Sequence, residues 1–136
     1  MTFSFEIITP EKIVFQDEVN EVIVPTVSGE VSILPNHAAL LSQIAPGELT
    51  IKKDSKEYFL AITGGFLEVN NNKVSILADY AVRSEDIELA KAQEAQKRAE
   101  KVMQEKGNDR DFAMAEAQFR RAILELKIGT KRRKHV

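Results

Sequence analysis

The fold is decided by Ser28-Gly-Glu-Val-Ser-Ile-Leu-Pro-Asn-His37 and, further on, by Thr63-Gly-Gly-Phe-Leu-Glu-Val69. In both stretches apolar residues alternate with polar ones between glycine, proline and asparagine, which is the pattern of half-buried β-strands bounded by turns. Gly64-Gly65 predicts a hairpin turn. A phosphate-binding loop is disfavoured there, because no Gly-Lys pair follows and the next residues alternate as a strand.

The same alternation recurs from the N-terminus to Ala81, with turn residues at intervals of roughly 8 to 12 residues. The apolar positions are Phe3-Phe5-Ile7, Val22-Val24, Val31-Ile33, Leu49-Ile51, Phe59-Ala61 and Val74-Ile76. Val and Ile dominate, and no helix-length apolar stripe intervenes. Residues 1–84 are therefore predicted to form a mainly antiparallel β-sandwich, or flattened barrel, of about eight to ten strands.

After Arg83 the composition changes to Ala, Glu, Lys, Gln and Arg, which are strong helix formers. A first helix is predicted over 87–106, with Ser84 or Asp86 as its N-cap. Gly107 should end that helix and Asn108 should cap a second helix over 110–128. Residues 85–136 are thus predicted to be an antiparallel helical hairpin, which makes the whole chain an α+β protein of two domains.

The predicted helices differ in their apolar stripes. The second carries a coiled-coil-like seam of Phe112, Ala115, Phe119, Ala122 and Leu126. The first offers only the smaller residues Ala92, Ala95, Ala99 and Val102. Such a stripe removes little apolar area from water, so the hairpin alone should be marginally stable and able to exchange one docking surface for another.

Composition excludes several classes of function. The 136 residues contain no cysteine, so disulfides, thiolate metal sites and thiol nucleophiles are ruled out. No apolar stretch approaches the roughly 20 residues of a spanning helix, and the N-terminus shows no targeting pattern. The sequence therefore predicts a soluble, untargeted protein.

The charge is distributed unevenly. Residues 1–84 carry 6 basic and 11 acidic side chains, whereas residues 85–136 carry 13 basic and 10 acidic ones. The basic end suits an acidic protein, a phosphate or a nucleic acid, although a solvated tail explains it equally well. It contains Lys127, Lys131, Arg132, Arg133 and Lys134.

No catalytic or metal-binding cluster is visible in the sequence. His37 follows Pro-Asn and is expected to be an ordinary turn residue, while His135 lies near the end of the chain. Glu68 has no matched acid, nucleophile or oxyanion donor beside it, so it is expected to be a cross-strand partner and not a general base.

The chain resembles the epsilon subunit of the F-type (rotary) ATP synthase over nearly its whole length. The resemblance rests on Gly29-Glu30, Pro35 to His37, Gly64-Gly65, Glu68-Val69 and Leu77-Ala78-Asp79 through Arg83. The family usually has glycine where this chain has Asn36. Asparagine also tolerates a left-handed backbone, so the turn is expected to survive.

The resemblance implies a non-catalytic central-stalk subunit that couples proton-driven rotation to ATP synthesis. It implies that Glu30 and His37 lie on loops of the sandwich that face the c-ring and gamma, and that the hairpin meets acidic loops of the beta subunits and inhibits ATP hydrolysis. The implied inhibitory face comprises Arg110, Arg120, Arg121, Lys127 and Arg132. The implied location is the cytoplasmic face of the bacterial plasma membrane, with the chloroplast thylakoid as the alternative.

Some members of this family bind ATP on the hairpin through an Ile/Leu-Asp-x-x-Arg-Ala motif. Here Glu88 and Lys91 replace the aspartate and the arginine, and neither reproduces the original hydrogen-bond geometry. Arg98 and Arg121 match phosphate-facing positions, but the charge of Glu125 opposes phosphate. We therefore expect no cofactor, and only weak ATP binding if there is any.

A different class of function is a free-standing binder that uses the basic C-terminal tail on a sandwich scaffold to hold an acidic protein or nucleic acid. The sequence disfavours nucleic acid. The basic residues are not interleaved with aromatics, and the sandwich is acidic.

Overall fold

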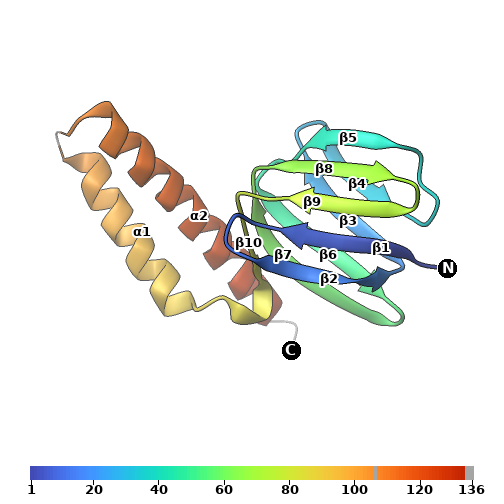
Figure 1. Ribbon diagram of the computed structural model, residues 1–136. Helices are drawn as coiled ribbons and strands as arrows, with labels where there is room; N and C mark the ends of the chain where they lie inside the picture. The colour runs from blue at the N-terminus through green and yellow to red at the C-terminus, as the bar shows by residue number, and fades with distance from the viewer. Residues whose placement is uncertain (106, 134–136) are drawn as a thin grey trace. The chain divides into compact units, whose positions relative to one another are not determined.

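The computed structural model describes residues 1–105 and 107–133. The chain forms two compact units, Met1–Arg83 and Ser84–Val136. The first is a β-sandwich and the second is a pair of helices, which confirms the predicted α+β class (Figure 1). Three predictions fall outside the described residues, namely the end of the first helix at Lys106 and the tail residues Lys134 and His135.

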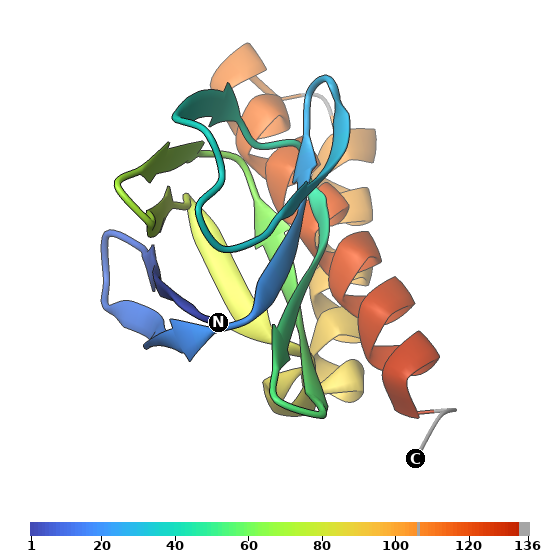
Figure 2. The same ribbon diagram turned by 90° about the vertical axis from the view of Figure 1, so that its right-hand side faces the viewer.

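The sandwich consists of two five-stranded sheets, seen as separate layers in Figure 2. In the order β2-β1-β9-β8-β5, the first sheet comprises Ile13–Val19, Phe3–Ile8, Lys73–Leu77, Phe66–Asn70 and Leu40–Gln43. In the order β10-β7-β6-β3-β4, the second comprises Tyr80–Arg83, Lys56–Thr63, Gly47–Lys53, Glu21–Thr26 and Gly29–Ile33. The pairing of β1 with β9 is parallel, and the other paired strands run antiparallel.

The core lies between the two sheets, where the predicted alternation is confirmed for most strands. Phe3, Phe5 and Ile7 of β1 are buried, as are Val22 and Val24 of β3. The prediction for β7 was wrong by one residue. Leu60 and Ile62 belong to the core cluster, whereas Phe59 is only half-buried and Ala61, although buried, lies outside that cluster. The run Phe59-Leu60-Ala61-Ile62 is apolar throughout, so its periodicity could not indicate the inward face.

Gly64 and Gly65 do not form the predicted hairpin. They connect β7 of one sheet to β8 of the other. Both have positive φ, 56° and 107°. A Cβ on Gly65 would lie 2.0 Å from the carbonyl oxygen of Leu77. Gly65 therefore allows a close backbone approach at a crossing between the sheets.

The second unit has a 3₁₀ turn over Ser84–Asp86, α1 over Leu89–Gln104 and α2 over Asp109–Arg133. The first helix begins later than predicted because Ser84 closes the 3₁₀ turn, in which Ile87 N donates to its carbonyl at 3.3 Å. The C-cap is Glu105, with an extended backbone, and not Gly107. The predicted N-cap Asn108 is confirmed, since its Oδ1 accepts from Asp111 N at 2.7 Å.

Apart from Ile128, small residues form the buried positions of the two helices. Ala92 and Ala99 of α1 are buried, as are Ala115 and Ala122 of α2, and the two helices pack together. The large members of the predicted seam contribute less than expected. Phe112 is 43% exposed, while Phe119 and Leu126 are half-buried.

The second helix continues past its predicted end at Ile128 because Gly129 allows a close approach. A Cβ on Gly129 would lie 2.8 Å from Leu89 Cδ2 and 3.0 Å from Ile87 Cγ2. The Arg133 guanidinium donates to the Ile87 carbonyl at the same end of the hairpin. These contacts offset the low helix propensity of glycine.

We predict that Gly129→Ala destabilises the hairpin although alanine is the better helix former. The added methyl group overpacks against Leu89 and Ile87, at a cost of about 1 to 3 kcal/mol. The measurement is the thermal melt of the helical circular dichroism signal of the full chain. Thr130→Ala, at the exposed neighbouring position, is the control. Equal melting of Gly129→Ala and the parent would contradict the close approach.

Candidate interaction surfaces

Glu30 and His37 lie along one edge of the sandwich. Glu30 is an exposed residue of the edge strand β4, opposite Pro25 of β3, so it is in a strand and not in the loop that the resemblance suggested. His37 follows the other end of β4 and is half-buried, with Nδ1 2.7 Å from the carbonyl oxygen of Ala38. One edge thus carries both residues.

The same edge exposes three large apolar side chains that sequence reasoning missed. Val27 is 61% exposed, Leu34 is 54% exposed and Leu41 is 72% exposed. Leu41 belongs to β5, the edge strand of the other sheet, and the bridge between Thr26 and Ile44 joins this side of the two sheets. We call Val27, Glu30, Leu34, His37 and Leu41 the edge surface. These residues lie on or beside the edge strands β4 and β5, and large apolar side chains exposed at such positions are candidates for an interaction site.

A second apolar group crosses the outer face of the first sheet. Strand register places Phe66 opposite Leu77, Leu77 beside Ile8, and Ile8 opposite Ile13. Phe66 and Leu77 are each 54% exposed. We call these four residues the apolar row. They come from four neighbouring strands, so only the register reveals that they lie together.

A shallow pocket adjoins the apolar row. Its volume is about 520 Å³, and it is lined by Ile8, Phe66 and Leu77 of the row together with Thr9, Pro10, Gln43, Gly64, Gly65, Ala78 and Asp79. Asp79 is the charged residue of this lining. The surface therefore offers apolar contact beside a single carboxylate.

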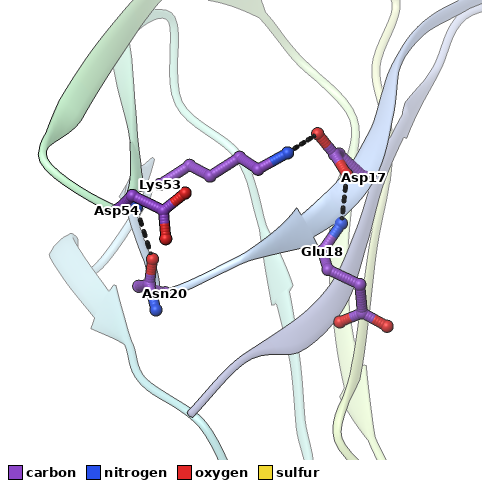
Figure 3. A network of polar contacts seen from close by, with 5 residues as sticks. All are labelled: Asp17, Glu18, Asn20, Lys53 and Asp54. Atoms are coloured by element: carbon purple, nitrogen blue, oxygen red, sulfur yellow. Dashed lines mark hydrogen bonds and ion pairs between the residues drawn. The ribbon is translucent and has the colours of Figure 1, made fainter.

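The far side of the sandwich is joined by polar contacts between the two sheets (Figure 3). The Lys53 ammonium of β6 donates to the Asp17 carboxylate of β2, and Asp17 also accepts from Glu18 N at 2.8 Å. These two hydrogen bonds, the one from Lys53 first, lower the pKa of Asp17. Asp54 N donates to Asn20 Oδ1 at 2.6 Å beside them. This network links the two sheets, and we call it the clasp.

The five basic residues of the predicted inhibitory face fall on two lines of α2. Arg110, Arg121 and Arg132 recur every 11 residues, close to three turns, whereas Arg120 and Lys127 are 7 apart, close to two turns. Arg120 pairs with Glu116 at 2.7 Å, and Arg121 pairs with Glu125 at 3.2 Å. The structure thus brings them together as two stripes and not as one patch.

The four residues considered for nucleotide binding are all engaged in ion pairs within their own helices. Glu88 pairs with Lys91 at 3.1 Å, and Arg98 lies 3.9 Å from Glu94. Arg121 forms an ion pair with Glu125, and both residues belong to α2. Each cation would have to leave a carboxylate of its own helix before it could meet a phosphate.

Over residues 1–105 and 107–133, no cluster of His, Cys, Asp or Glu has the arrangement of a metal site. Within the same ranges, no helix is long and apolar enough to cross a membrane.

Comparison with known proteins agrees with this architecture. Residues 2–84 match the family model described as ATP synthase, Delta/Epsilon chain, beta-sandwich domain. Residues 85–128 match the model described as ATP synthase, Delta/Epsilon chain, long alpha-helix domain. The chain belongs to the ATP synthase delta/epsilon family. The predicted resemblance is confirmed.

Curated members of the delta/epsilon family match nearly end to end. The ATP synthase epsilon chain of Dehalococcoides mccartyi is 47% identical, covering 96% of this chain and 94% of that protein. The one from Herpetosiphon aurantiacus is 41% identical, covering 98% of each. Family membership therefore gives this chain the role of an epsilon-type subunit of a rotary ATP synthase, and the alternative of a free-standing binder is not supported.

Solved structures of rotary ATP synthases contain similar chains. One comes from the OSCP/F1/c-ring structure of the Euglena gracilis mitochondrial ATP synthase, with a TM-score of 0.65 and 25% identity over 95% of this chain and 78% of that chain. Another comes from the central stalk/c-ring structure of the Tetrahymena thermophila enzyme. Its TM-score is 0.58 at 17% identity, over 93% of this chain and 95% of that chain, so it supports the fold alone.

We predict that Asp17→Asn weakens the clasp between the sheets in a pH-dependent way. The lowered pKa of Asp17 means that its contribution to stability is present above the ordinary value of 3.8 and is lost as the pH falls through the folded-state pKa. The pair is exposed, so the decrease in Tm at pH 6 should be no more than about a few degrees. The difference between variant and parent should shrink below pH 3.8.

Thermal melts from pH 6 to pH 2.5 test this. Glu18→Gln is the control, because it removes a neighbouring carboxylate outside the ion pair. A difference in Tm that stays constant with pH would contradict the role of the Asp17 charge.

Proposed function

We propose that the sandwich of this rotary ATP synthase subunit holds two partners at once, the c-ring through the edge surface and gamma through the apolar row. The observation that supports this most is the presence of two separate groups of exposed apolar side chains on one small domain. A subunit that transmits torque between the c-ring and gamma must bind both of them, since a subunit bound to only one could not pass its rotation to the other.

The edge surface is assigned to the c-ring. It contains Glu30 and His37, the two residues that the family resemblance marks, and adds Val27, Leu34 and Leu41 around them. Apolar anchors supply binding energy, and the polar pair supplies orientation. The apolar row is then left for gamma, with Asp79 at its border to pair with a basic residue.

We propose further that the chain itself is non-catalytic and lies on the cytoplasmic face of a bacterial plasma membrane, held there by the complex. Catalysis would then belong to other subunits of the synthase.

The hairpin is proposed to be the regulatory element. Its two basic stripes face acidic loops of the beta subunits in an extended state that blocks ATP hydrolysis, and its small-residue contacts stabilise a compact state. The two states use different faces of α2, since Ala115 and Ala122 are buried whereas Arg120 and Lys127 are exposed. A change in either face therefore shifts the population in a known direction.

ATP is proposed to bind the hairpin no more than weakly. The ion pair between Glu88 and Lys91, together with that between Arg121 and Glu125, competes with phosphate for the cations. Loss of the family's aspartate and arginine adds to this effect.

We predict that substitutions in the two sandwich surfaces have separable effects. Leu34→Ser should weaken c-ring binding about tenfold and leave gamma binding unchanged, because a truncated interface anchor costs upward of about 1 kcal/mol. Leu77→Ser should do the reverse. Both side chains are 54% exposed, so folding is spared. The measurement is the affinity of each full-length variant for isolated c-ring and, separately, for gamma. Parallel loss of both affinities in either variant would contradict the assignment.

We predict that replacing Arg120, Arg121 and Lys127 together with Ala relieves inhibition of ATP hydrolysis by the reconstituted complex. Removing these charges should favour the compact hairpin while leaving its alanine contacts in place. The parent's inhibition should weaken with salt, since exposed charges are screened within about 8 Å at physiological ionic strength.

Lys91→Ala, Lys97→Ala and Lys101→Ala together on α1 provide a charge-matched control. If the α2 variant inhibits as strongly as the parent across the salt series, the electrostatic contact does not exist.

A further inference from the structure

The turn that carries His37 adopts a backbone conformation that asparagine tolerates better than most residues. Asn36 has φ 63°, in the left-handed region. The turn lies in the connection between β4 and β5, where the chain passes from one sheet to the other. It therefore gains no order from strand pairing, and something else must fix its position.

One distant side chain contacts this turn directly. Asn36 N donates to Asn72 Oδ1 at 2.8 Å. The nitrogen of the same side-chain amide makes a second hydrogen bond, in which Asn72 Nδ2 donates to the carbonyl oxygen of Thr2 at 3.0 Å. The Asn72 backbone is tied to the sheet as well, since its carbonyl accepts from Ser4 N at 3.2 Å.

Asn72 belongs to a tight turn of the first sheet. Asn71 and Asn72 form the two-residue loop between the paired residues Asn70 and Lys73, with φ of 51° and 58°. Two left-handed residues in a two-residue loop are typical of a type I′ hairpin. The side chain of Asn72 thus projects from a fixed turn, half-buried, between the N-terminal segment and the Asn36 turn.

We propose that Asn72 is a positioning residue for c-ring binding, because it holds the Pro35 to His37 turn against the first sheet and so presents His37 in one geometry. This inference rests on the proposed contact between the edge surface and the c-ring. The amide makes both contacts, but the one that holds the turn needs only the acceptor, because Asn36 N is the donor there.

The side chain can be removed without disturbing its own turn. Asn72→Gly retains a residue that favours positive φ and gives the Asn-Gly pair preferred in type I′ loops. Asn71→Gly makes the same kind of change one residue earlier and is the matched control. Asn72→Asp keeps an acceptor for Asn36 N but loses the donor to Thr2.

The first measurement is amide hydrogen exchange of Asn36 in the isolated full chain. Loss of one hydrogen bond should accelerate exchange about fivefold in Asn72→Gly, with little change in Asn71→Gly or Asn72→Asp. The second measurement is c-ring affinity. It should fall about fivefold in Asn72→Gly alone, since binding must then order the turn. Equal exchange rates in Asn72→Gly and Asn71→Gly would overturn the proposal, as would faster exchange with undiminished affinity.

His37→Ala separates this inference from the proposed function. Reduced c-ring affinity of His37→Ala and Asn72→Gly together supports both ideas. If neither variant changes the affinity, the c-ring assignment of the edge surface fails, and the positioning role fails with it. If only His37→Ala reduces the affinity, the assignment stands and the role of Asn72 is refuted.

Discussion

The sandwich depends on a corner where two backbones approach more closely than any side chain allows. Gly65 lies in the connection from β7 to β8, and a Cβ on it would lie 2.0 Å from the carbonyl oxygen of Leu77. Leu77 is the last residue of β9, where the connection to β10 begins. Ile44 N donates to the Gly65 carbonyl at 2.9 Å, so the connection from β5 to β6 meets the same corner. Three passages between the sheets thus converge here. The corner also fixes Phe66 and Leu77, and with them the end of the apolar row.

Local chemistry explains what the sequence predicted well. Alternation identified most inward residues, and the asparagine cap and the left-handed tolerance of Asn36 follow from short-range hydrogen bonding and sterics. The errors arise where the deciding contact is distant. Gly64-Gly65 looks the same in sequence whether the next strand returns to its own sheet or crosses to the other. The run in β7 is apolar at every position and shows no alternation, so the sequence could not indicate which of its side chains face the core.

The interaction surfaces were predicted less completely than the fold. Glu30 and His37 came from the family resemblance, and nothing in their own residue types distinguishes them. The apolar row was invisible because Ile8, Ile13, Phe66 and Leu77 belong to four strands and meet only through register. A signal for the edge surface did exist. Leu34 follows the strand end at Ile33 and breaks its alternation, which leaves an apolar side chain without an inward position.

The helical hairpin combines a well-defined helix packing with a small stabilising free energy. Its alanines and Gly129 fix the separation of the helices, because larger side chains would force them apart. The same small residues bury little apolar area, at roughly 25 cal/mol for each Å². The exposed ion pairs on its helices add little, since solvent screens them. Stability therefore cannot be raised by enlarging the core without losing the close approach. For an element limited in this way, a modest contact to its exposed face in another state would be enough to shift the equilibrium, which is the condition that a regulatory switch requires.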